Sequence, residues 1–223
     1  MQFKGIRKNP SAPQVNPAHI AALRDIPVAA LSDNMHRNIG SVGLRPYHRP
    51  GPGTMAGTAV TIRSRGGDNL TLLRAFEFCR PGDVIVIDAD GDVANAVIGG
   101  ILSFYAATIG TVGVVLDGAI RDLAEIRERD FPVYARGVNH RGPYKDGPGE
   151  INVPVSVGGM RVNPGDIVVG DQDGLMAFSP VDAEWLIEKA RAHLATEAET
   201  MRAMKEGRWD RSFVDALEAR CPN

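Results

Sequence analysis

The stretch GVVLDGAIRD, Gly113–Asp122, indicates the fold class of this chain. A short apolar strand, predicted over Thr111–Leu116, runs into a glycine-containing turn, and Arg121 and Asp122 follow it side by side. Ligands and catalytic groups of α/β proteins collect where strands end and helices begin. A carboxylate there can hold a divalent metal ion, and a guanidinium can bind a carboxylate or a developing enolate. The simpler alternative is that Asp122 caps a helix over Leu123–Arg129 and that Arg121 is solvated.

Strands and helices are predicted to alternate on both sides of this stretch. Val84–Ile87 is an apolar run typical of a strand covered on both faces, and Gly57–Arg63 alternates like a half-buried strand. Asn95–Ile109 is apolar and alanine-rich and is predicted as a helix, with Gly99 and Gly100 near its start. Other helices are predicted over Pro17–Arg24, Val28–Arg37 and Leu70–Cys79, and another strand over Pro132–Ala135. This alternation indicates a layered α/β core.

The region after residue 150 is predicted to be mostly strand. Ile151–Val157, Ile167–Val169 and Leu175–Phe178 would add a mainly antiparallel layer to the core. Pro81–Val86 is echoed by Pro164–Val169, so we expect the same turn to lead into two strands.

The C-terminal part is predicted to be helical. A long helix is expected over Asp182–Lys205, with Asp182 as its N-cap and Gly207 as its C-cap, and a short helix over Phe213–Arg220.

Length and charge limit the classes of function. The 223 residues fit one large domain, or one domain with an appendage. Lysine and arginine number 25 and aspartate and glutamate 27, so the net charge of −2 does not point to nucleic acid or anionic lipid. No stretch has the pattern of a signal peptide or a membrane span, and Cys79 and Cys221 form no CxxC motif or disulfide framework. We therefore expect a cytoplasmic protein that binds neither nucleic acid nor a membrane.

Few local motifs carry chemistry by themselves. The helix start Ile98–Leu102 could bind a carboxylate or phosphate through free backbone amides, or its glycines could simply allow tight packing. The acidic residues Asp88, Asp90 and Asp92 lack the spacing of a calcium loop and are interpreted as a solvated turn. No dinucleotide fingerprint, GxSxG or histidine metal motif occurs.

A loop over Asn139–Glu150 contains a further group of basic side chains. His140, Arg141 and Lys145 could form an anion-binding surface, and the alternative is that they are solvated. The sequence leaves open whether they reach the site around Arg121 and Asp122.

Several short stretches, taken in order, resemble the RraA-like family. This family groups regulators of ribonuclease activity with class II 4-hydroxy-4-methyl-2-oxoglutarate/4-carboxy-4-hydroxy-2-oxoadipate aldolases. No single stretch is specific for the family, but the order and spacing of the stretches over most of the chain are specific for it. The matching stretches are Gly57–Ile62, Gly67–Asn69, Pro81–Asp88, Gly99–Leu102, Asp117–Asp122, Asn152–Val155, Gly158–Gly159, Pro164–Asp166 and Asp171–Gly174.

The resemblance implies an architecture. It predicts a swivelling β/β/α sandwich with N-terminal helices over residues 1–180. A C-terminal helical extension over residues 181–223 would pack on a neighbouring subunit. The chain would associate with itself as a trimer or as a hexamer, a dimer of trimers.

The resemblance also implies roles for individual residues in an active site between subunits. Asp122 would ligate Mg²⁺, Mn²⁺ or another divalent ion, and Arg121 would bind the pyruvoyl part of a 2-oxo acid substrate. Glu197 of an adjacent subunit would reach the metal through water, and Glu199 is the competing choice. The substrate carboxylate would be held by four consecutive residues, Gly99, Gly100, Ile101 and Leu102.

The implied activity is that of a metal-dependent lyase. It would cleave a C–C bond in a pyruvate-containing 2-oxo acid, by retro-aldol cleavage or oxaloacetate decarboxylation, through a metal-stabilised pyruvate enolate. No lysine is placed for a Schiff base, which favours the metal route. One departure stands out, because the aldolases usually carry an acidic residue where this chain has Gly100. Its loss could change metal affinity, the route of proton transfer or substrate choice.

The alternative function is a non-catalytic regulator of ribonuclease activity that binds a protein partner. The regulators resemble only the core and stop near the position of Phe178. The predicted helix Asp182–Lys205 therefore favours the aldolase branch.

Overall fold

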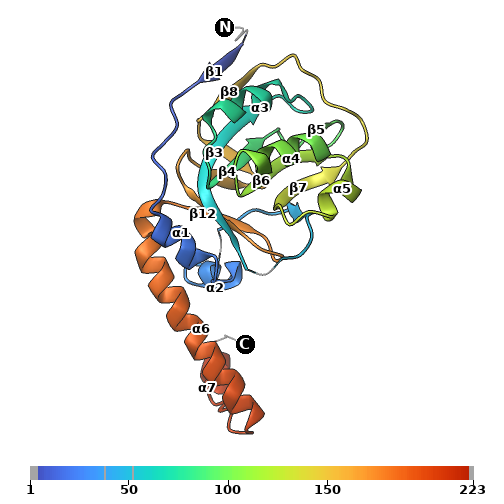
Figure 1. Ribbon diagram of the computed structural model, residues 1–223. Coiled ribbons are helices and arrows are strands. Elements are labelled where there is room, and N and C mark those ends of the chain that lie inside the picture. Colours follow the sequence, from blue (N-terminus) through green and yellow to red (C-terminus); the bar gives the residue numbers. More distant parts are fainter. Residues whose placement is uncertain (1–4, 38, 52, 221–223) are drawn as a thin grey trace.

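The computed structural model describes residues 5–37, 39–51 and 53–220 and shows a mixed α/β fold around one large sheet (Figure 1). The strands of the large sheet are β1 (Ile6–Lys8), β2 (Arg45–Pro46), β3 (Met55–Ser64), β4 (Asp83–Asp88), β5 (Ala96–Ile98), β6 (Gly113–Ile120), β7 (Val133–Val138), β8 (Gly149–Ile151), β11 (Ile167–Gly170) and β12 (Leu175–Phe178). A separate small sheet consists of β9 (Val155–Val157) and β10 (Met160–Val162). The helices are α1 (Pro17–Leu23), α2 (Val28–Asp33), α3 (Leu70–Ala75), α4 (Gly100–Thr108), α5 (Leu123–Arg127), α6 (Ala183–Lys205) and α7 (Phe213–Glu218). Short 3₁₀ helices span Phe76–Phe78 and Pro180–Asp182.

The centre of the large sheet is parallel, and antiparallel pairs flank it on both sides, including β2 with β7. Strands β3, β4, β6 and β7 run parallel, in that order. Strands β8 and β11 pair antiparallel with β3, and β12 pairs antiparallel with β11. The predicted α/β core is therefore confirmed, but the strands predicted to form an added antiparallel layer are divided: β11 and β12 extend the large sheet, and β9 pairs with β10 in the small sheet.

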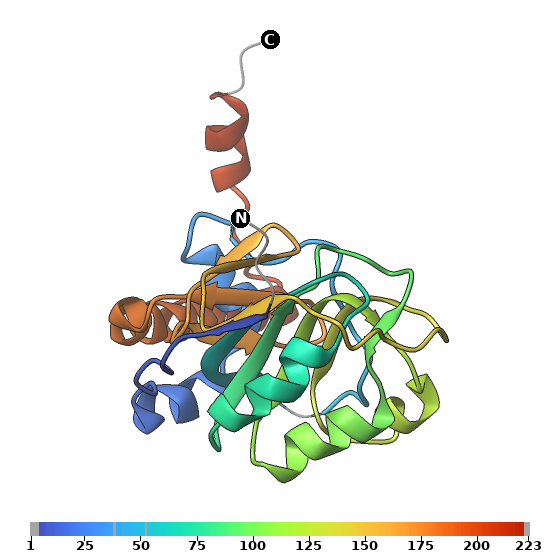
Figure 2. The same ribbon diagram turned by 90° about the horizontal axis from the view of Figure 1, so that it is seen from above.

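Strand β4 shows why the sheet is buried on both faces. Ile85 and Ile87 belong to a core cluster that includes residues of α3, α4 and α5. Val84 and Val86 belong to a second cluster, which includes residues of β9 and β10. Burying each such side chain contributes about 1.5–3 kcal/mol relative to exposure. The result is a helix layer, a large sheet and a small sheet, and Figure 2 shows α3 and α4 together on one face.

Two sequence predictions near the end of β6 are wrong. The residues Ala96–Ile98, predicted as the beginning of a helix, form β5, because they pair in parallel with Ala119 and Ile120 of β6. The expected turn at Asp117 is strand, since β6 continues to Ile120 through a local shift of register. The side chain of Asp117 is held there by Arg136 and by the backbone N–H of Gly158. As a result, β5 and β6 end together beside the start of α4.

The C-terminal helix α6 packs on the body at its beginning and then leaves it. Leu186, Ile187 and Ala190 are buried in a cluster with residues of α1 and α2. Beyond them α6 projects away from the sheet (Figure 1), and α7 points away from it (Figure 2). The predicted extension is present, although a domain boundary at residue 180 stays a prediction. Within the described ranges, no helix is long and apolar enough to cross a membrane.

The caps of α6 agree with the sequence at one end only. Asp182 precedes the helix, but its side chain accepts no capping hydrogen bond, so the predicted N-cap interaction is wrong. The hydroxyl of Ser179 instead accepts a hydrogen bond from Val181 N–H and begins the preceding 3₁₀ turn. Gly207 follows the end of the helix with a φ of 68°, as predicted for a glycine that ends a helix.

The sequence echo corresponds to one turn used twice. Asp83 Oδ2 accepts a hydrogen bond from Arg80 N–H, and Asp166 Oδ2 accepts one from Asn163 N–H. The glycine before each aspartate has a left-handed φ, 90° at Gly82 and 89° at Gly165. The expectation that the same turn enters both strands is confirmed.

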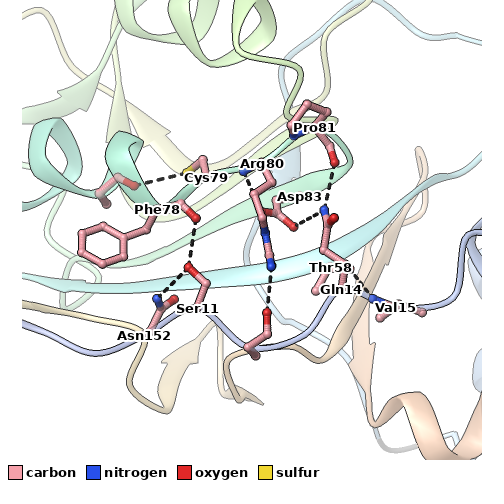
Figure 3. Close-up of polar contacts among 12 residues, drawn as sticks. Ser11, Gln14, Val15, Thr58, Phe78, Cys79, Arg80, Pro81, Asp83 and Asn152 are labelled. Atoms are coloured by element: carbon pink, nitrogen blue, oxygen red, sulfur yellow. Dashed lines mark hydrogen bonds and ion pairs between the residues drawn. The ribbon is translucent and has the colours of Figure 1, made fainter.

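The first of these turns also anchors the N-terminal segment (Figure 3). Gln14 Nε2 donates to Asp83 Oδ1, and Arg80 Nη2 donates to the carbonyl of Ala12. Ser11 donates to the carbonyl of Phe78. These hydrogen bonds, one of them to the buried carboxylate of Asp83, hold the segment from Ser11 to Gln14 against the edge of the core.

Cys79, beside this turn, is expected to react slowly with alkylating agents. Burial, with a smaller effect of the nearby Asp83, raises the pKa of its thiol to about 12. Only the thiolate is nucleophilic, so the native Cys79 should be labelled by iodoacetamide roughly 10³-fold more slowly than in guanidinium chloride at about pH 8. Mass spectrometry of the Cys79 peptide measures both rates. Equal rates in the native and the unfolded protein would contradict the burial of this thiol.

Candidate functional site

The candidate site is a cavity of about 310 Å³ at the ends of β5 and β6 and the start of α4. Its lining includes most of the residues that the sequence singled out: Gly99, Ile101, Leu102, Arg121 and Asp122. Asn69 and Leu73, at the start of α3, and the loop residues Gly142, Pro143 and Lys145 complete much of the remaining wall. Because parallel strands end at one edge of a sheet, the site has the position expected for ligand binding in this class of fold.

Asp122 caps a helix, but not the one predicted from the sequence. Its backbone is left-handed, with φ 58° and ψ 43°, and its side chain makes no capping bond to α5. Instead, its Oδ2 accepts a hydrogen bond of 3.0 Å from Gly100 N–H, at the first turn of α4. A left-handed non-glycine residue costs on the order of 1–3 kcal/mol and collects at functional sites. This conformation turns the carboxylate away from its own helix and into the cavity.

Arg121 lies between Asp122 and the loop that closes the cavity. Its Nε is 3.6 Å from Asp122 Oδ2, and 40% of its side chain is exposed. A Cβ atom on Gly142 would lie 2.9 Å from Arg121 Nη1, so the guanidinium rests close to that glycine. The backbone N–H of Arg121 donates to the carbonyl of Ile98, which fixes the residue beside β5. The guanidinium is thus held at the cavity wall and remains accessible to a ligand.

The two glycines at the start of α4 are required by the charged side chains around them. A Cβ atom on Gly99 would lie 2.4 Å from Asp122 Oδ2, closer than real contacts allow. The carboxylate of Asp122 accepts the hydrogen bond from the amide of Gly100. No described residue accepts a hydrogen bond from the amides of Ile101 or Leu102. Free amides at a helix start bind anions, aided by the helix dipole. The structure therefore brings a candidate carboxylate site, at Ile101 and Leu102, next to Arg121 and Asp122.

Glu125 is a candidate site residue that sequence reasoning missed. Its Oε2 lies 2.1 Å from where a Cβ atom on Gly100 would be, so its carboxylate stands in the space of the missing side chain. The residue lies on α5, three positions after Asp122 in the chain, but Asp122 precedes this helix with a left-handed backbone, so the spacing carried no signal in the sequence. The acid that the resemblance led us to expect at position 100 is replaced in space by a glutamate from another element.

The loop over residues 139–150 contributes one basic side chain to the cavity. Lys145 lines it, while His140 and Arg141 are not among the lining residues. The loop is fixed by Asp68, whose Oδ2 accepts hydrogen bonds from the backbone N–H groups of Asp146 and Gly147. The other wall carries Asn69, whose Oδ1 is buried without a hydrogen-bond partner in the described chain.

The carboxylate of Asp122, which lines the cavity, fits a divalent ion that takes few ligands from protein. Asp122 uses Oδ2 for Gly100 and Arg121, which leaves Oδ1 without a hydrogen bond among the described residues. The described ranges contain no group of three or more histidine, cysteine, aspartate or glutamate side chains that could hold a metal. Mg²⁺ keeps several waters and is commonly bound by one or two carboxylates and substrate oxygens. The donor set therefore fits Mg²⁺ or Mn²⁺ better than a closed zinc site.

The glutamates predicted to complete the site do not reach it from the same chain. Glu197 and Glu199 lie on α6, and neither lines the cavity. Glu197 Oε1 is 3.2 Å from His193 Nε2, and Glu199 Oε2 is 2.6 Å from Arg202 Nη1. A contribution of either glutamate from an adjacent subunit stays a prediction.

Fold and cavity together define a class: an α/β protein whose strand-end cavity presents a guanidinium, a carboxylate and free helix-start amides. The chain belongs to the RraA-like family, because the family model described as Aldolase/RraA matches residues 28–177.

Named relatives include both aldolases and regulators. A Halalkalibacterium halodurans protein provisionally named 4-hydroxy-4-methyl-2-oxoglutarate aldolase is 37% identical over 189 residues, covering 84% of this chain and 89% of the relative. The solved structure of the RNA-processing inhibitor RraA from Thermus thermophilus has a TM-score of 0.62 and 30% identity, covering 69% of this chain and 92% of that one. An uncharacterized Pseudomonas syringae pv. tomato protein has a TM-score of 0.78, covering 87% of this chain and 92% of that one, but its 24% identity shows the fold alone.

Proposed function

We propose that this protein is a divalent-metal-dependent lyase that cleaves a C–C bond in a pyruvate-containing 2-oxo acid. The observation that carries the proposal is the meeting of Arg121, Asp122 and the free amides of Ile101 and Leu102 in one cavity. The aldolase name of the Halalkalibacterium halodurans relative supports the reaction class. Substrates of the 4-hydroxy-4-methyl-2-oxoglutarate type, and oxaloacetate through decarboxylation, fit this chemistry.

The substrate would be held at its pyruvoyl end. The amides of Ile101 and Leu102 would bind the C1 carboxylate, because they are exposed donors at the positive end of a helix. Arg121 would donate to the carbonyl oxygen at C2, where negative charge develops during cleavage. Lys145, across the cavity, adds a second positive charge for an anionic substrate.

Bond cleavage would leave a pyruvate enolate in the cavity. Breaking the C3–C4 bond moves its electron pair onto C3 and the C2 oxygen. In the retro-aldol route the C4 hydroxyl gives up its proton and the other product leaves as a carbonyl compound, whereas in decarboxylation the other product is CO₂. A proton added at C3 then converts the enolate into pyruvate. Arg121 would stabilise this charge, while Asp122 would hold the divalent ion. A divalent ion, when bound, supplies Lewis acidity toward a 2-oxo acid. Glu125 would position a water molecule for proton transfer, as its carboxylate lies beside Gly100, whose neighbours Gly99 and Ile101 line the cavity.

Glu125→Gln is expected to lower kcat by about tenfold with little change in KM, because the amide keeps the shape but loses the proton-accepting carboxylate. Glu128→Gln, an exposed glutamate nearby in the chain, is the matched control and should leave kcat unchanged. Glu125→Ala should also lower kcat, and the double variant Gly100→Asp/Glu125→Ala should be more active than Glu125→Ala alone. The reason is that the space at position 100, which Glu125 normally fills, is then free for the carboxylate of the new aspartate. A kcat for Glu125→Gln within twofold of the control would remove Glu125 from the mechanism.

Self-association as a trimer or hexamer is part of the proposal. The described chain offers few metal ligands at the cavity, and α6 carries Glu197 away from it (Figure 1). The far end of α6 and the segment after it expose large apolar side chains, which mark interaction surfaces in soluble proteins. They are Met201, Met204, Trp209 and Phe213. An adjacent subunit that covers them could receive Glu197 at its own cavity.

The second candidate is a regulator of ribonuclease activity. The likeness to the Thermus thermophilus RNA-processing inhibitor favours it, and that structure covers 69% of this chain. A regulator needs no metal and no turnover. The two candidate functions therefore differ in whether the protein turns over a 2-oxo acid in a metal-dependent reaction.

The test is a panel of 2-oxo acids, assayed for pyruvate release with Mg²⁺ or Mn²⁺ and again with excess chelator. The proposal expects release from 4-hydroxy-4-methyl-2-oxoglutarate or oxaloacetate above the rate with metal alone, and loss of this release with chelator. Turnover of no member of the panel would favour the regulator.

A further inference from the structure

Arg129, just after α5, contacts residues at the start of α4 from outside the cavity. Its Nη1 donates a hydrogen bond of 2.8 Å to the carbonyl of Gly100 and lies 3.4 Å from Ser103 Oγ. Its guanidinium lies over the ring of Phe104, 5.2 Å from the centroid, and its Nη2 is 3.5 Å from Glu125 Oε2. Arg129 does not line the cavity. It therefore joins the first turn of α4 to the carboxylate that replaces the missing acid.

The hydrogen bond to Gly100 supports a neighbouring amide. The carbonyl of Gly100 and the N–H of Ile101 belong to one planar peptide unit, in which they point in opposite directions. The carbonyl points along α4, where Ser103 Oγ and Arg129 both donate to it, so Arg129 adds a charged donor that holds the peptide unit of the cavity-lining Ile101. Asp122 holds the preceding peptide through Gly100 N–H. Both peptide units that flank the Gly100 α-carbon are therefore clamped by charged side chains.

The ion pair with Glu125 fixes the second group. Glu125 is 58% exposed, so the pair alone contributes little stability. Its effect is directional, because the pair draws the carboxylate toward Gly100 and the start of α4. Phe104 and Ser103 restrict the guanidinium on its other sides.

We infer that Arg129 is a positioning residue for the proposed reaction: it aims the Ile101 amide at the substrate carboxylate and holds Glu125 beside the reacting atoms. This inference rests on the proposed lyase function. It makes two separable expectations, since the amide acts on substrate binding and Glu125 acts on turnover. A purely structural arginine, bracing α5 against α4, would affect neither once the protein is folded.

The test compares Arg129→Gln and Arg129→Lys with Arg127→Gln, an exposed arginine of the same segment for which no ion pair occurs among the described residues. Arg129→Gln should raise KM about tenfold and weaken pyruvate binding, measured at equilibrium by NMR, by a similar factor. Arg129→Lys should recover part of both losses, because it keeps the charge. When Arg129→Gln is combined with Glu125→Gln, KM should still rise, but kcat should stay at the value of the Glu125→Gln variant alone.

The outcomes separate this inference from the proposed function. An active wild type whose Arg129→Gln and Arg127→Gln variants share the same KM, kcat and pyruvate affinity would overturn the positioning role alone. A wild type that neither turns over the panel nor binds pyruvate would overturn the proposed function and this inference together. If Arg129→Gln fails to fold, the folded Arg129→Lys variant must show weaker pyruvate binding than Arg127→Gln, or the inference is wrong.

Discussion

Asp122→Asn is expected to lower kcat/KM for pyruvate release on the order of 10²-fold or more, with the fold intact. The asparagine Oδ1 can still accept the hydrogen bond from Gly100 N–H, and asparagine tolerates the left-handed backbone of this position. What is lost is the negative charge that would hold the divalent ion. The defect should therefore include a weaker affinity for Mn²⁺, measured by electron paramagnetic resonance.

Asp90→Asn is the matched control for this prediction. Asp90 also has a left-handed backbone, with a φ of 59°, but it does not line the cavity. The same chemical change there should leave activity and Mn²⁺ affinity unchanged. If the Asp122→Asn variant keeps its metal-dependent activity, Asp122 is not the metal ligand.

Arg121→Met should also lower kcat/KM on the order of 10²-fold, because it removes the donor aimed at the developing enolate. Methionine keeps much of the apolar stem, whose Cγ lies beside Gly99, so the start of α4 should stay in place. Arg121→Lys should recover only part of the loss, since an ammonium cannot reproduce the planar fork of a guanidinium.

Steady-state kinetics of Arg121→Met and of Arg161→Met, an exposed residue on β10, measure the effect. The Arg121 variant should keep its affinity for Mn²⁺, which distinguishes it from Asp122→Asn. An Arg121→Met enzyme as active as the Arg161→Met enzyme would show that the guanidinium does not act on the enolate.

Much of the core was predictable because its burial leaves a clear pattern. Val84–Ile87 reads as a strand covered on both faces, and its side chains indeed alternate between two cores. The short strand β5 was missed, because three apolar residues before a helix carry no periodicity that separates strand from helix. Pairing with the end of β6, which decides the matter, is a contact between distant parts of the chain.

The candidate site shows the same division. Arg121, Asp122 and the helix start were found from their order along the chain, and the structure brings them into one cavity. Asp122 caps α4 instead of α5 because its backbone is left-handed, and no local motif in the sequence predicts that conformation. Glu125 and Arg129 were missed for a related reason. They act in space on Gly100, although they follow it by more than twenty positions in sequence.

Stabilisation of a pyruvate enolate by the cavity can be tested without knowing the natural substrate. Pyruvate in D₂O, followed by proton NMR, reports exchange of its methyl hydrogens when an enolate forms and reverts. We expect exchange with the wild-type protein and Mg²⁺ or Mn²⁺, its loss with chelator, and its loss in Asp122→Asn but not in Asp90→Asn. No exchange above the metal-only rate, or exchange that is indifferent to chelator and to Asp122, would contradict it.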